Sequence, residues 1–442
     1  MKISIIGTGY VGLVTGVCLA SKGHQVTCVD IDRARVEALN AARSPIFERG
    51  LDELLRDTVG RTLTATTDLP EAVRSSDVTF VAVGTPFDGR SIDLSAVLGA
   101  SREIGEVLQE KDGYHVVVVK STVVPGTTDG CVRAALESAS GKQAGRDFGL
   151  GMNPEFLSEG EAVHDFLFPD RLVLGGVDDR SIDLLDTVYR PFPEALRIRT
   201  NTRTAEMIKY ASNALLANLI SFSNEIANLG AALGDIDSVD VMRGVHISQY
   251  FRARDDEGLP GITSFLRAGC GFGGSCLPKD VKALIVHGEG AGLDMSLLKA
   301  VIRVNEEQPA RVLQLLRKHW TDLRGVRIAV LGLAFKPGTS DVRESPAFPI
   351  IRLLREHGAE LRAYDPVAMN EARAVIPESD IRYCESLPSA LENVDAVVVV
   401  TPWEEFQGVP AALRTHASAP VLVDCRAAFE RTSVPRYERI GL

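Results

Sequence analysis

Short runs of β-branched and other apolar residues alternate with longer helical patterns over residues 1–200. Five of these runs have the length of a strand and are apolar on both faces: residues 3–6, 25–29, 78–83, 116–119 and 172–174. Strands of this kind belong to parallel sheets that helices cover on both sides. The segments between them, such as residues 93–109, are long enough for crossover helices. The pattern therefore predicts a doubly wound α/β domain.

The pattern changes over residues 202–233, which contain no proline and no strand signal. Apolar residues recur there at spacings of three and four, which places them on one face of a helix. This stripe consists of Ile208, Ala211, Leu215, Leu219, Phe222 and Ile226. Other faces also carry apolar residues, so we expect a long helix that is buried on more than one side. Such a helix is suited to joining two domains and to forming a dimer interface. A second helical stretch is expected over residues 280–316.

After this helical section the α/β pattern resumes and echoes the start of the chain. Residues 326–332 lead into a helix and then a strand that ends in Asp365. In the same way, residues 3–7 lead into a helix and a strand that ends in Asp30. The sequence therefore predicts two related α/β halves on either side of a helical connector.

Composition and charge exclude several classes of protein. A chain of 442 residues is too long for one hydrophobic core, and 45% hydrophobic with 24% charged residues excludes wholesale disorder. The net charge of −11 disfavours binding to a nucleic-acid backbone. Glycines interrupt the apolar stretch that ends near Ala20, and apolar runs elsewhere have the length of strands. We therefore expect neither a signal peptide nor a membrane span.

The cysteines indicate a reducing compartment. The 7 cysteines are spread thinly, with no CxxC pair and no Cys/His spacing of a zinc site. We therefore expect a cytoplasmic protein with no disulfide framework and no metal. Inert core positions are expected for Cys18, Cys28, Cys131, Cys384 and Cys425, and Cys270 remains unassigned.

A glycine-rich motif, Gly7-Thr8-Gly9-Tyr10-Val11-Gly12, lies between the first predicted strand and a helix. Gly7 permits the tight turn, Gly9 lets a pyrophosphate approach the backbone, and Gly12 allows close packing of helix on strand. Asp30 ends the second strand, where an acidic residue accepts both ribose hydroxyls and repels a 2′-phosphate. The motif predicts a dinucleotide site that prefers NAD. The alternative is a glycine-rich turn without a ligand.

A second glycine-dense loop, residues 271–280, runs into Cys276 and then into a helix that Pro278 can open. The positive end of the helix dipole and nearby Lys279 both lower the pKa of a thiol at this position. We expect the glycines to be flexible, which lets a substrate reach the sulfur. The segment predicts a nucleophilic Cys276, and the alternative is an inert core cysteine.

Other polar residues leave their roles open. Lys209 and Asn213 are four residues apart and share a face of the long helix. A hydrogen-bonded contact between domains would explain these two polar residues as well as a role in the chemistry would. Residues 153–159 carry two carboxylates that a capped helix start would also explain. Residues 120–122 follow a predicted strand at the sheet edge where ligands gather. Residues 332–337 replace the glycine fingerprint, so a second dinucleotide is not expected.

A dinucleotide site together with an activated cysteine is suited to oxidation past the aldehyde level. A thiol captures the aldehyde, hydride leaves, and water cleaves the thioester. A simple alcohol dehydrogenase would not need the cysteine.

The chain resembles the UDP-glucose/GDP-mannose dehydrogenase family over nearly its whole length. The resemblance lies in the motifs GTGYVG, NPEFLSEG, AEMIKYASNALLA, GFGGSCLPKD and GLAFKPGTSDVRESPA. It implies an α/β fold of two Rossmann-like, doubly wound parallel-sheet domains joined by a long central helix that forms a homodimer. The implied parts are an NAD-binding domain (1–200), a helical connector with the cysteine loop (201–316) and a domain that binds the nucleotide sugar (317–442). The implied reaction is a four-electron oxidation of the sugar's C6 alcohol by two NAD⁺.

The resemblance also implies roles for individual residues. Cys276 would be the nucleophile that forms the thiohemiacetal and the thioester. Lys209 and Asn213 would stabilise oxyanion character, and Asp280 would assist proton transfer. Thr122 and Glu155 would order the hydrolytic water, and Glu155 would be a candidate base in thioester hydrolysis.

The implied binding residues fall into two groups. For the cofactor they are Gly7, Gly9, Tyr10, Val11, Gly12, Asp30, Arg35, Thr85, Thr122, Glu159, Lys279 and Arg343. For the nucleotide sugar they are Glu155, Phe156, Leu157, Lys209, Asn213, Phe265, Gly273, Cys276, Phe335 and Lys336.

One departure from the family keeps the sugar open. Members that act on UDP-glucose usually carry an arginine shortly before the Phe-Leu of the cysteine loop, whereas this chain has Pro260-Gly261-Ile262 before Phe265. UDP-glucose is favoured, and GDP-mannose or another UDP-hexose remains an alternative. A two-electron 3-hydroxyacid dehydrogenase would give no reason for the cysteine loop. A catalytically silent NAD-binding sensor would have no use for Cys276, Lys209 and Asp280 together.

Overall fold

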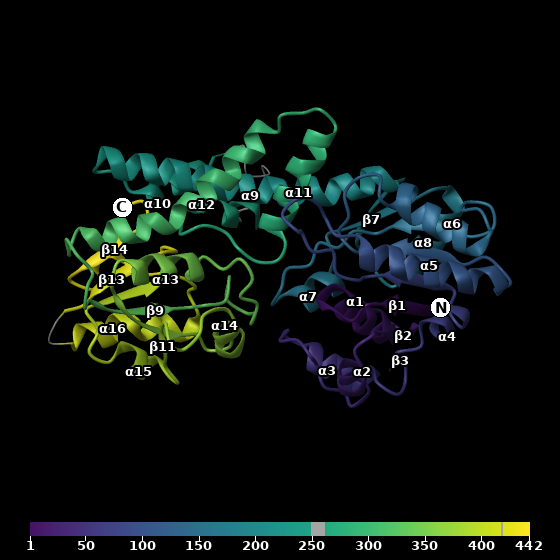
Figure 1. The fold of residues 1–442 in the computed structure, drawn as a ribbon, viewed down its shortest axis with the longest axis horizontal. Coiled ribbons are helices and arrows are strands. Elements are labelled where there is room, and N and C mark those ends of the chain that lie inside the picture. Colours follow the sequence, from purple (N-terminus) through teal and green to yellow (C-terminus); the bar gives the residue numbers. More distant parts are fainter. Residues whose placement is uncertain (249–260, 417–418) are drawn as a thin grey trace. The chain divides into compact units, whose positions relative to one another are not determined.

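Apolar runs along the chain assemble into two sheets, one in each of two compact units (Figure 1). The computed structural model describes residues 1–248, 261–416 and 419–442. The chain divides into a unit of Met1–Ser212 and a unit of Asn213–Leu442. Both units are α/β, and one long helix, α9 (Thr202–Leu233), runs through the division. The predicted fold class and the predicted central helix are confirmed.

The N-terminal unit contains an eight-stranded sheet with the order β3-β2-β1-β4-β5-β6-β7-β8. Its elements before α9 are β1 (Lys2–Ile6), α1 (Tyr10–Ser21), β2 (Gln25–Val29), α2 (Arg33–Asn40), α3 (Leu51–Thr58), β3 (Leu63–Thr66), α4 (Leu69–Arg74), β4 (Val78–Val81), α5 (Ser95–Glu110), β5 (Val116–Val119), η1 (Thr128–Val132), α6 (Arg133–Ser140), β6 (Gly149–Met152), α7 (Ala162–Leu167), β7 (Arg171–Gly176), α8 (Asp179–Val188) and β8 (Leu196–Asn201). Neighbouring strands are parallel except β6 and β7, which are antiparallel. The strand order reverses between β1 and β4, which is where open α/β sheets bind ligands.

Both faces of this sheet are buried, as the apolar runs predicted. Consecutive residues of β1, such as Ile5 and Ile6, belong to different hydrophobic cores. Residues of α1, α3, α7 and α8 form the core on one face, and residues of α4, α5 and α6 form the core on the other. All four residues of β5 are fully buried. This is the doubly wound arrangement.

The C-terminal unit contains a six-stranded parallel sheet with the order β11-β10-β9-β12-β13-β14. Its elements after α9 are α10 (Ser238–His246), η2 (Gly261–Phe265), α11 (Leu277–Gly290), α12 (Ser296–Arg317), β9 (Arg327–Leu331), α13 (Ala347–Glu356), β10 (Glu360–Tyr364), α14 (Met369–Val375), β11 (Arg382–Tyr383), α15 (Leu387–Leu391), β12 (Ala396–Val399), η3 (Glu404–Gly408), α16 (Val409–Arg414), β13 (Val421–Asp424), η4 (Arg431–Ser433) and β14 (Tyr437–Arg439). Its first five strands repeat the order of β1 to β5, so the predicted echo between the two halves is present.

Several elements differ from the prediction, two of them for clear local reasons. The helical stretch expected over residues 280–316 is divided into α11 and α12, because Gly292 (φ +82°) and Met295 (φ +52°) adopt left-handed conformations that a helix cannot contain. The strand β6 was not predicted because glycine has a low strand propensity. Gly149 is required there, since a Cβ would lie 2.9 Å from the Val116 side chain.

The surface of α9 is arranged differently from the prediction. We expected the apolar stripe to be buried, yet Leu215 is 49% and Phe222 is 46% exposed. The polar residues Glu206, Lys209 and Asn213 are buried instead. Contacts within each unit therefore cover the polar face of the helix and leave much of its apolar stripe exposed.

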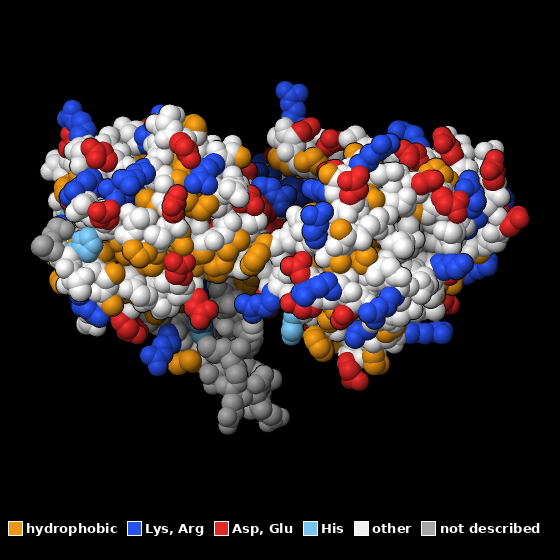
Figure 2. Space-filling view, turned by 90° about the horizontal axis from the view of Figure 1, so that it is seen from below, with side chains coloured by type: hydrophobic (Ala, Val, Ile, Leu, Met, Phe, Trp, Pro, Cys, Tyr) orange, Lys and Arg blue, Asp and Glu red, His pale blue; other side chains and the backbone are white. Residues whose placement is uncertain are grey.

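Acidic and basic side chains are interspersed on the face that Figure 2 presents. This distribution differs from the continuous basic surface that nucleic-acid binding favours. In the described part of the chain, no helix is both long and apolar enough to cross a membrane.

Candidate active site

The turn after β1 has two glycines that packing requires and one that it does not. Gly7 has a φ of +95°, and a Cβ there would lie 2.9 Å from the carbonyl oxygen of Ala82. A Cβ on Gly12 would lie 1.9 Å from the carbonyl oxygen of Gly7. Gly9 is the N-cap residue of α1, and a Cβ there would meet no protein atom within 4 Å. The open space beside Gly9 at a helix N-terminus fits the phosphates of a dinucleotide.

Asp30 follows β2 and is held by its neighbours. Its carboxylate accepts hydrogen bonds from the Thr8 backbone N–H at 2.9 Å, the Thr8 hydroxyl at 2.5 Å and the Asp32 N–H at 3.0 Å. Partial burial opposes the charge, but these bonds and the charge of Arg35 lower the pKa of Asp30. The carboxylate is therefore ionised and fixed at the sheet edge where ribose hydroxyls bind.

A carboxylate that the sequence did not indicate ties Tyr10 to a distant loop. Tyr10 donates a hydrogen bond to Glu48, which also accepts from the backbone N–H groups of Gly160 at 2.7 Å and Ala162 at 3.0 Å. Glu48 is buried. It connects the glycine turn with the segment that contains Glu159, and no motif surrounds it in the sequence.

Two further predicted cofactor residues of this unit lie at neighbouring strand ends. Thr85 and Thr122 follow β4 and β5, and the Thr85 hydroxyl donates to the Thr122 carbonyl oxygen at 2.8 Å. Together with Gly7, Asp30 and the start of α1, they line the carboxyl ends of four adjacent strands.

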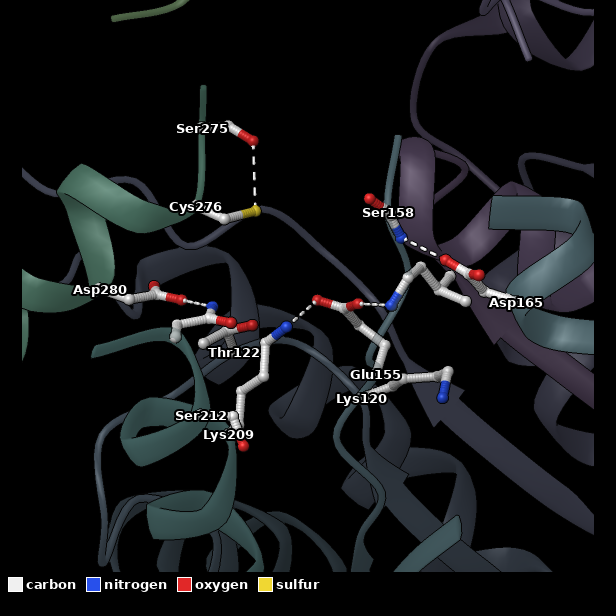
Figure 3. Close-up of polar contacts among 12 residues, drawn as sticks. Lys120, Thr122, Glu155, Ser158, Asp165, Lys209, Ser212, Ser275, Cys276 and Asp280 are labelled. Atoms are coloured by element: carbon white, nitrogen blue, oxygen red, sulfur yellow. Dashed lines mark hydrogen bonds and ion pairs between the residues drawn. The ribbon is translucent and has the colours of Figure 1, made fainter. Parts of the chain in front are cut away.

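Glu155 and Lys209 form a buried ion pair in the N-terminal unit (Figure 3). Glu155 Oε1 lies 2.8 Å from Lys209 Nζ, and each side chain is 5% exposed. Glu155 Oε2 accepts a hydrogen bond from the Leu157 N–H at 2.7 Å. Burial would raise the pKa of Glu155, but Lys209, the Leu157 N–H and Lys120 outweigh it and lower the pKa. Glu155 is therefore ionised in this arrangement.

Phe156 packs beside this pair. The Arg171 guanidinium lies 4.0 Å from its ring centroid, and Lys209 Nζ lies 5.6 Å from it. The aromatic ring thus lies close to two cations, and these contacts restrict the side chains of Arg171 and Lys209.

Asn213 and Asp280 are brought together in the C-terminal unit by α9 and α11. Asn213 Nδ2 donates to Asp280 Oδ2 at 2.6 Å, and Lys279 Nζ lies 2.6 Å from Asp280 Oδ1. Asp280 is 1% exposed. The charge of Lys279, which the sequence placed near the thiol, is paired with this carboxylate.

Cys276 is the N-cap residue of α11, and Pro278 is the second residue of the helix. Its Sγ lies 3.5 Å from the Ser275 hydroxyl oxygen, and the residue is half-buried (Figure 3). The other cysteines are buried except Cys131, which is exposed. The core position expected for Cys131 is therefore wrong, because its helical turn, η1, turns this residue toward solvent.

The cysteine loop is held by hydrogen bonds to its neighbours. Asn224 accepts from the Gly269 N–H at 2.7 Å. Asn305 bonds both the N–H and the carbonyl oxygen of Phe272, at 2.7 and 3.0 Å. Arg426 donates to the Gly271 carbonyl oxygen at 2.8 Å.

Close packing accounts for two glycines of this loop. A Cβ on Gly273 would lie 2.2 Å from the Glu344 carbonyl oxygen. A Cβ on Gly274 would lie 2.8 Å from the Phe335 ring. The glycines therefore provide room for neighbouring backbone and aromatic atoms.

The other site residues that were predicted in the C-terminal unit are Lys336, Arg343 and Phe265. Lys336 Nζ lies 5.7 Å from the Phe335 ring centroid. Arg343 makes a two-point hydrogen bond with Asp341, and its carbonyl oxygen accepts from the Gly274 N–H at 2.9 Å. Phe265 is the last residue of η2. Pro260, where the family's arginine is replaced, lies outside the described residues.

Asp365 is the counterpart of Asp30 in the C-terminal sheet, but its carboxylate is fully engaged. It accepts from the backbone N–H groups of Leu333 and Ala334 and from the Trp403 indole at 3.0 Å. Its other oxygen accepts from two further N–H groups. It therefore has little capacity left for ribose hydroxyls, in line with the absence of the glycine fingerprint there.

The residues predicted for the site thus form two sets, one in each unit. Within the described residues, no group of three or more His, Cys, Asp or Glu side chains is arranged to hold a metal ion. The residues that the sequence missed are mostly those that hold other residues, namely Glu48 and Asn305, whereas Asn224 belongs to the polar face of the long helix on which Lys209 and Asn213 were noted. Lys120 was noted only as part of a strand end.

Comparisons with known proteins cover almost the whole chain. Three domains of the UDP-glucose/GDP-mannose dehydrogenase family match: the NAD binding domain over residues 1–193, the central domain over residues 203–307 and the UDP binding domain over residues 329–431. UDP-glucose 6-dehydrogenase AglM of Haloferax volcanii is 45% identical, with 100% of each chain covered. GDP-mannose 6-dehydrogenase of Pseudomonas aeruginosa is 41% identical, over 90% of this chain and 89% of the relative.

A solved structure is also similar over its full length. The UDP-glucose dehydrogenase of the hyperthermophilic archaeon Pyrobaculum islandicum superposes with a TM-score of 0.90 at 40% identity. The superposition covers 99% of this chain and 97% of that chain.

Proposed function

Because the chain belongs to the UDP-glucose/GDP-mannose dehydrogenase family of NAD-dependent enzymes, we propose that it oxidises the C6 alcohol of UDP-glucose to a carboxylate. The observation that carries this proposal is Cys276 at the N-cap of α11, in a loop that is hydrogen-bonded to Asn224 and Asn305. A thiol in this position is suited to a reaction that passes through a covalent aldehyde adduct. Full-length relatives named UDP-glucose 6-dehydrogenase support the choice of sugar.

The residues present fit NAD, and we assign its pyrophosphate to the open space beside Gly9 and its ribose to Asp30. When bound there, NAD⁺ would supply the acceptor for the hydride from C6. The other residues proposed to contact it are Gly7, Tyr10, Val11, Gly12, Arg35, Thr85, Thr122, Glu159, Lys279 and Arg343.

The proposed chemistry requires the two sets of residues to act on one substrate. The Cys276 thiolate attacks the C6 aldehyde, forming a C–S bond, while Lys209 and Asn213 stabilise the oxyanion. Loss of a second hydride converts this adduct to a thioester. Water then attacks the thioester, with its proton taken by Glu155, and the C–S bond breaks to release the acid and the thiolate. The balance is alcohol, water and two NAD⁺ to carboxylate, two NADH and three protons.

The remaining members of the proposed site hold the substrate or move protons. Asp280 assists proton transfer, and Thr122 orders the water. The residues proposed to contact the nucleotide sugar besides Cys276, Lys209, Asn213 and Glu155 are Phe156, Leu157, Phe265, Gly273, Phe335 and Lys336. We also propose that residues 1–200 bind NAD, that residues 201–316 connect the domains and carry the catalytic cysteine loop, and that residues 317–442 bind the nucleotide sugar.

The number of NADH molecules released per sugar tests this function. With UDP-glucose as the limiting substrate we expect two NADH per sugar, because the covalent adduct keeps the aldehyde on the enzyme between hydride transfers. Absorbance at saturating NAD⁺ measures the yield. One NADH per sugar would contradict the thioester route.

The same assay with other sugars tests the alternative substrate. The 41% identical GDP-mannose 6-dehydrogenase and the replaced arginine near Pro260 make GDP-mannose and other UDP-hexoses the competitors. We expect the highest kcat/KM with UDP-glucose. A higher kcat/KM with GDP-mannose would show that the enzyme is a GDP-mannose dehydrogenase and would contradict the proposed substrate.

We further propose that the enzyme is a cytoplasmic homodimer formed through α9. Support for the dimer comes from three apolar side chains spaced seven residues apart on this helix. Leu215, Phe222 and Leu229 are 49%, 46% and 55% exposed. Because residues seven apart share a helix face, they form a stripe that a second copy of α9 can cover. Support for the location comes from cysteines that are all free in the structure.

Charged substitutions on this stripe should separate the subunits. We expect Leu215→Asp with Phe222→Asp to give a monomer in sedimentation, because burying two carboxylates against each other strongly disfavours association. Val375→Asp is the matched control, since Val375 is 42% exposed on a different helix. A dimer that survives the double substitution would reject this interface.

A further inference from the structure

A buried lysine beside the Glu155–Lys209 pair has no role in the chemistry above. Lys120 directly follows β5 and is 3% exposed. Its ammonium donates to Asn153 Oδ1 at 2.9 Å and, more weakly, to the Asn153 carbonyl oxygen at 3.4 Å. Both acceptors belong to one neutral residue. A buried charge that is not in contact with a counter-ion destabilises a fold relative to an apolar side chain of similar size. Packing alone therefore does not account for a lysine here.

The hydrogen bonds of Lys120 hold the segment that carries Glu155. Asn153 lies two residues before Glu155, and both polar atoms of its side chain are hydrogen-bonded. Its Oδ1 also accepts from the Tyr189 hydroxyl at 2.5 Å, and its Nδ2 donates to the Val173 carbonyl oxygen at 2.9 Å. Burial raises the pKa of Tyr189, so this hydroxyl remains a donor. Lys120 and Tyr189 thus anchor the strand end from which Glu155 projects.

Lys120 also contributes to the charge around Glu155. The charged groups that face Lys120 are Glu155 and Lys209. Burial lowers the pKa of Lys120 to about 8; the attraction of Glu155 opposes this effect and Lys209 adds to it. Lys120 is therefore largely protonated at neutral pH, and its charge helps to lower the pKa of Glu155. The carboxylate has two positive neighbours, of which only Lys209 is in direct contact.

We propose that Lys120 is a positioning residue for thioester hydrolysis. Through Asn153 it fixes the segment that carries Glu155, and its charge keeps that carboxylate ionised when Lys209 turns to the substrate oxyanion. The inference rests on the proposed function, because it requires Glu155 to accept a proton from the hydrolytic water.

Neutral substitutions of Lys120 test the proposal through the pH profile of kcat. Removing the positive charge raises the pKa of Glu155, so Glu155 is protonated at a higher pH. For Lys120→Met we expect the acid limb of the profile to move up by about one pH unit, and kcat below the limb to fall about tenfold. The affinity for NAD should not change. The measurement is NADH formation at saturating UDP-glucose and NAD⁺, over a pH range that extends below the acid limb of the wild type.

Two further variants separate the charge from the hydrogen bond. Lys120→Gln keeps a donor for Asn153 and loses the charge, so we expect it to show the same shift of the acid limb. Lys120→Arg keeps the charge and should retain the wild-type limb.

Lys111→Met is the matched control. Lys111 lies in the same unit, has a pKa that burial lowers to about 8, and donates to carbonyl oxygens of Val73 and Arg74 at 2.6 and 3.0 Å. Because its partners are outside the proposed site, this variant should keep the wild-type pH profile. An equal shift in Lys111→Met would overturn the proposal.

Other outcomes are also decisive. A wild-type acid limb in folded Lys120→Met and Lys120→Gln would reject the proposed role. If both neutral variants fail to fold while Lys111→Met folds, Lys120 serves stability alone, and this outcome would also reject the proposed positioning role. A wild-type enzyme that releases one NADH per sugar would instead reject the proposed function, which distinguishes the two failures.

Discussion

Cys276→Ser should abolish the formation of acid while leaving the binding of NAD intact. The serine hydroxyl is not usefully ionised near neutral pH, so it cannot replace a thiolate at the N-cap of α11. We expect the rate of acid formation to fall by about 10³-fold or more. The measurement is chromatographic detection of the acid together with NAD titration by fluorescence.

Cys131→Ser is the matched control, because Cys131 is the exposed cysteine of η1 and belongs to the other unit. This variant should retain wild-type activity. Unimpaired acid formation by Cys276→Ser would falsify the covalent mechanism. Loss of activity in both variants would show that the assay reports general damage to the protein.

Lys209→Met should destabilise the protein and inactivate it. The substitution leaves the Glu155 carboxylate buried without the partner that now lies 2.8 Å away. Removing one member of a buried ion pair typically reduces the free energy of unfolding by about 3–5 kcal/mol. We therefore expect a lower melting temperature, and loss of turnover because the oxyanion is no longer stabilised.

The pH dependence of this loss has a definite sign. In the wild type, the pKa of Glu155 is lower in the folded protein than in the unfolded chain, so ionised Glu155 stabilises the fold. This stabilisation is fully present above the pKa of an unfolded glutamate, and it is lost as the pH falls through the pKa of Glu155 in the folded protein. In Lys209→Met, burial acts without its main opponent, so the charged form of Glu155 destabilises the fold. The difference in melting temperature between wild type and variant should therefore be larger at pH 7.5 than at pH 4.5.

Two controls separate the ion pair from general effects. Adding Glu155→Gln to Lys209→Met removes the unpaired charge and should recover part of the lost stability. Arg146→Met breaks an exposed pair with Asp147 and should leave the melting temperature close to that of the wild type. Equal melting temperatures for Lys209→Met and the wild type would show that the pair does not stabilise the fold.

Local patterns in the chain predicted the elements that depend on neighbouring residues. The spacing of apolar residues predicted α9 over residues 202–233, where the structure has it. The glycine motif predicted a strand, a tight turn and a helix, and Gly7 adopts the left-handed conformation that this turn requires. Helix periodicity, strand runs and turn chemistry arise within a few residues, so they can be recognised without the fold.

The contacts that hold the candidate site connect residues far apart in the chain, and the folded structure alone reveals them. Glu48 bonds Gly160, which is 112 residues away, and Asn213 bonds Asp280, which is 67 residues away. No local pattern encodes such pairs, because they depend on how helices and sheets pack. The same reason explains α9: its spacing predicted the helix, but only packing determined that its polar face is buried and its apolar stripe exposed.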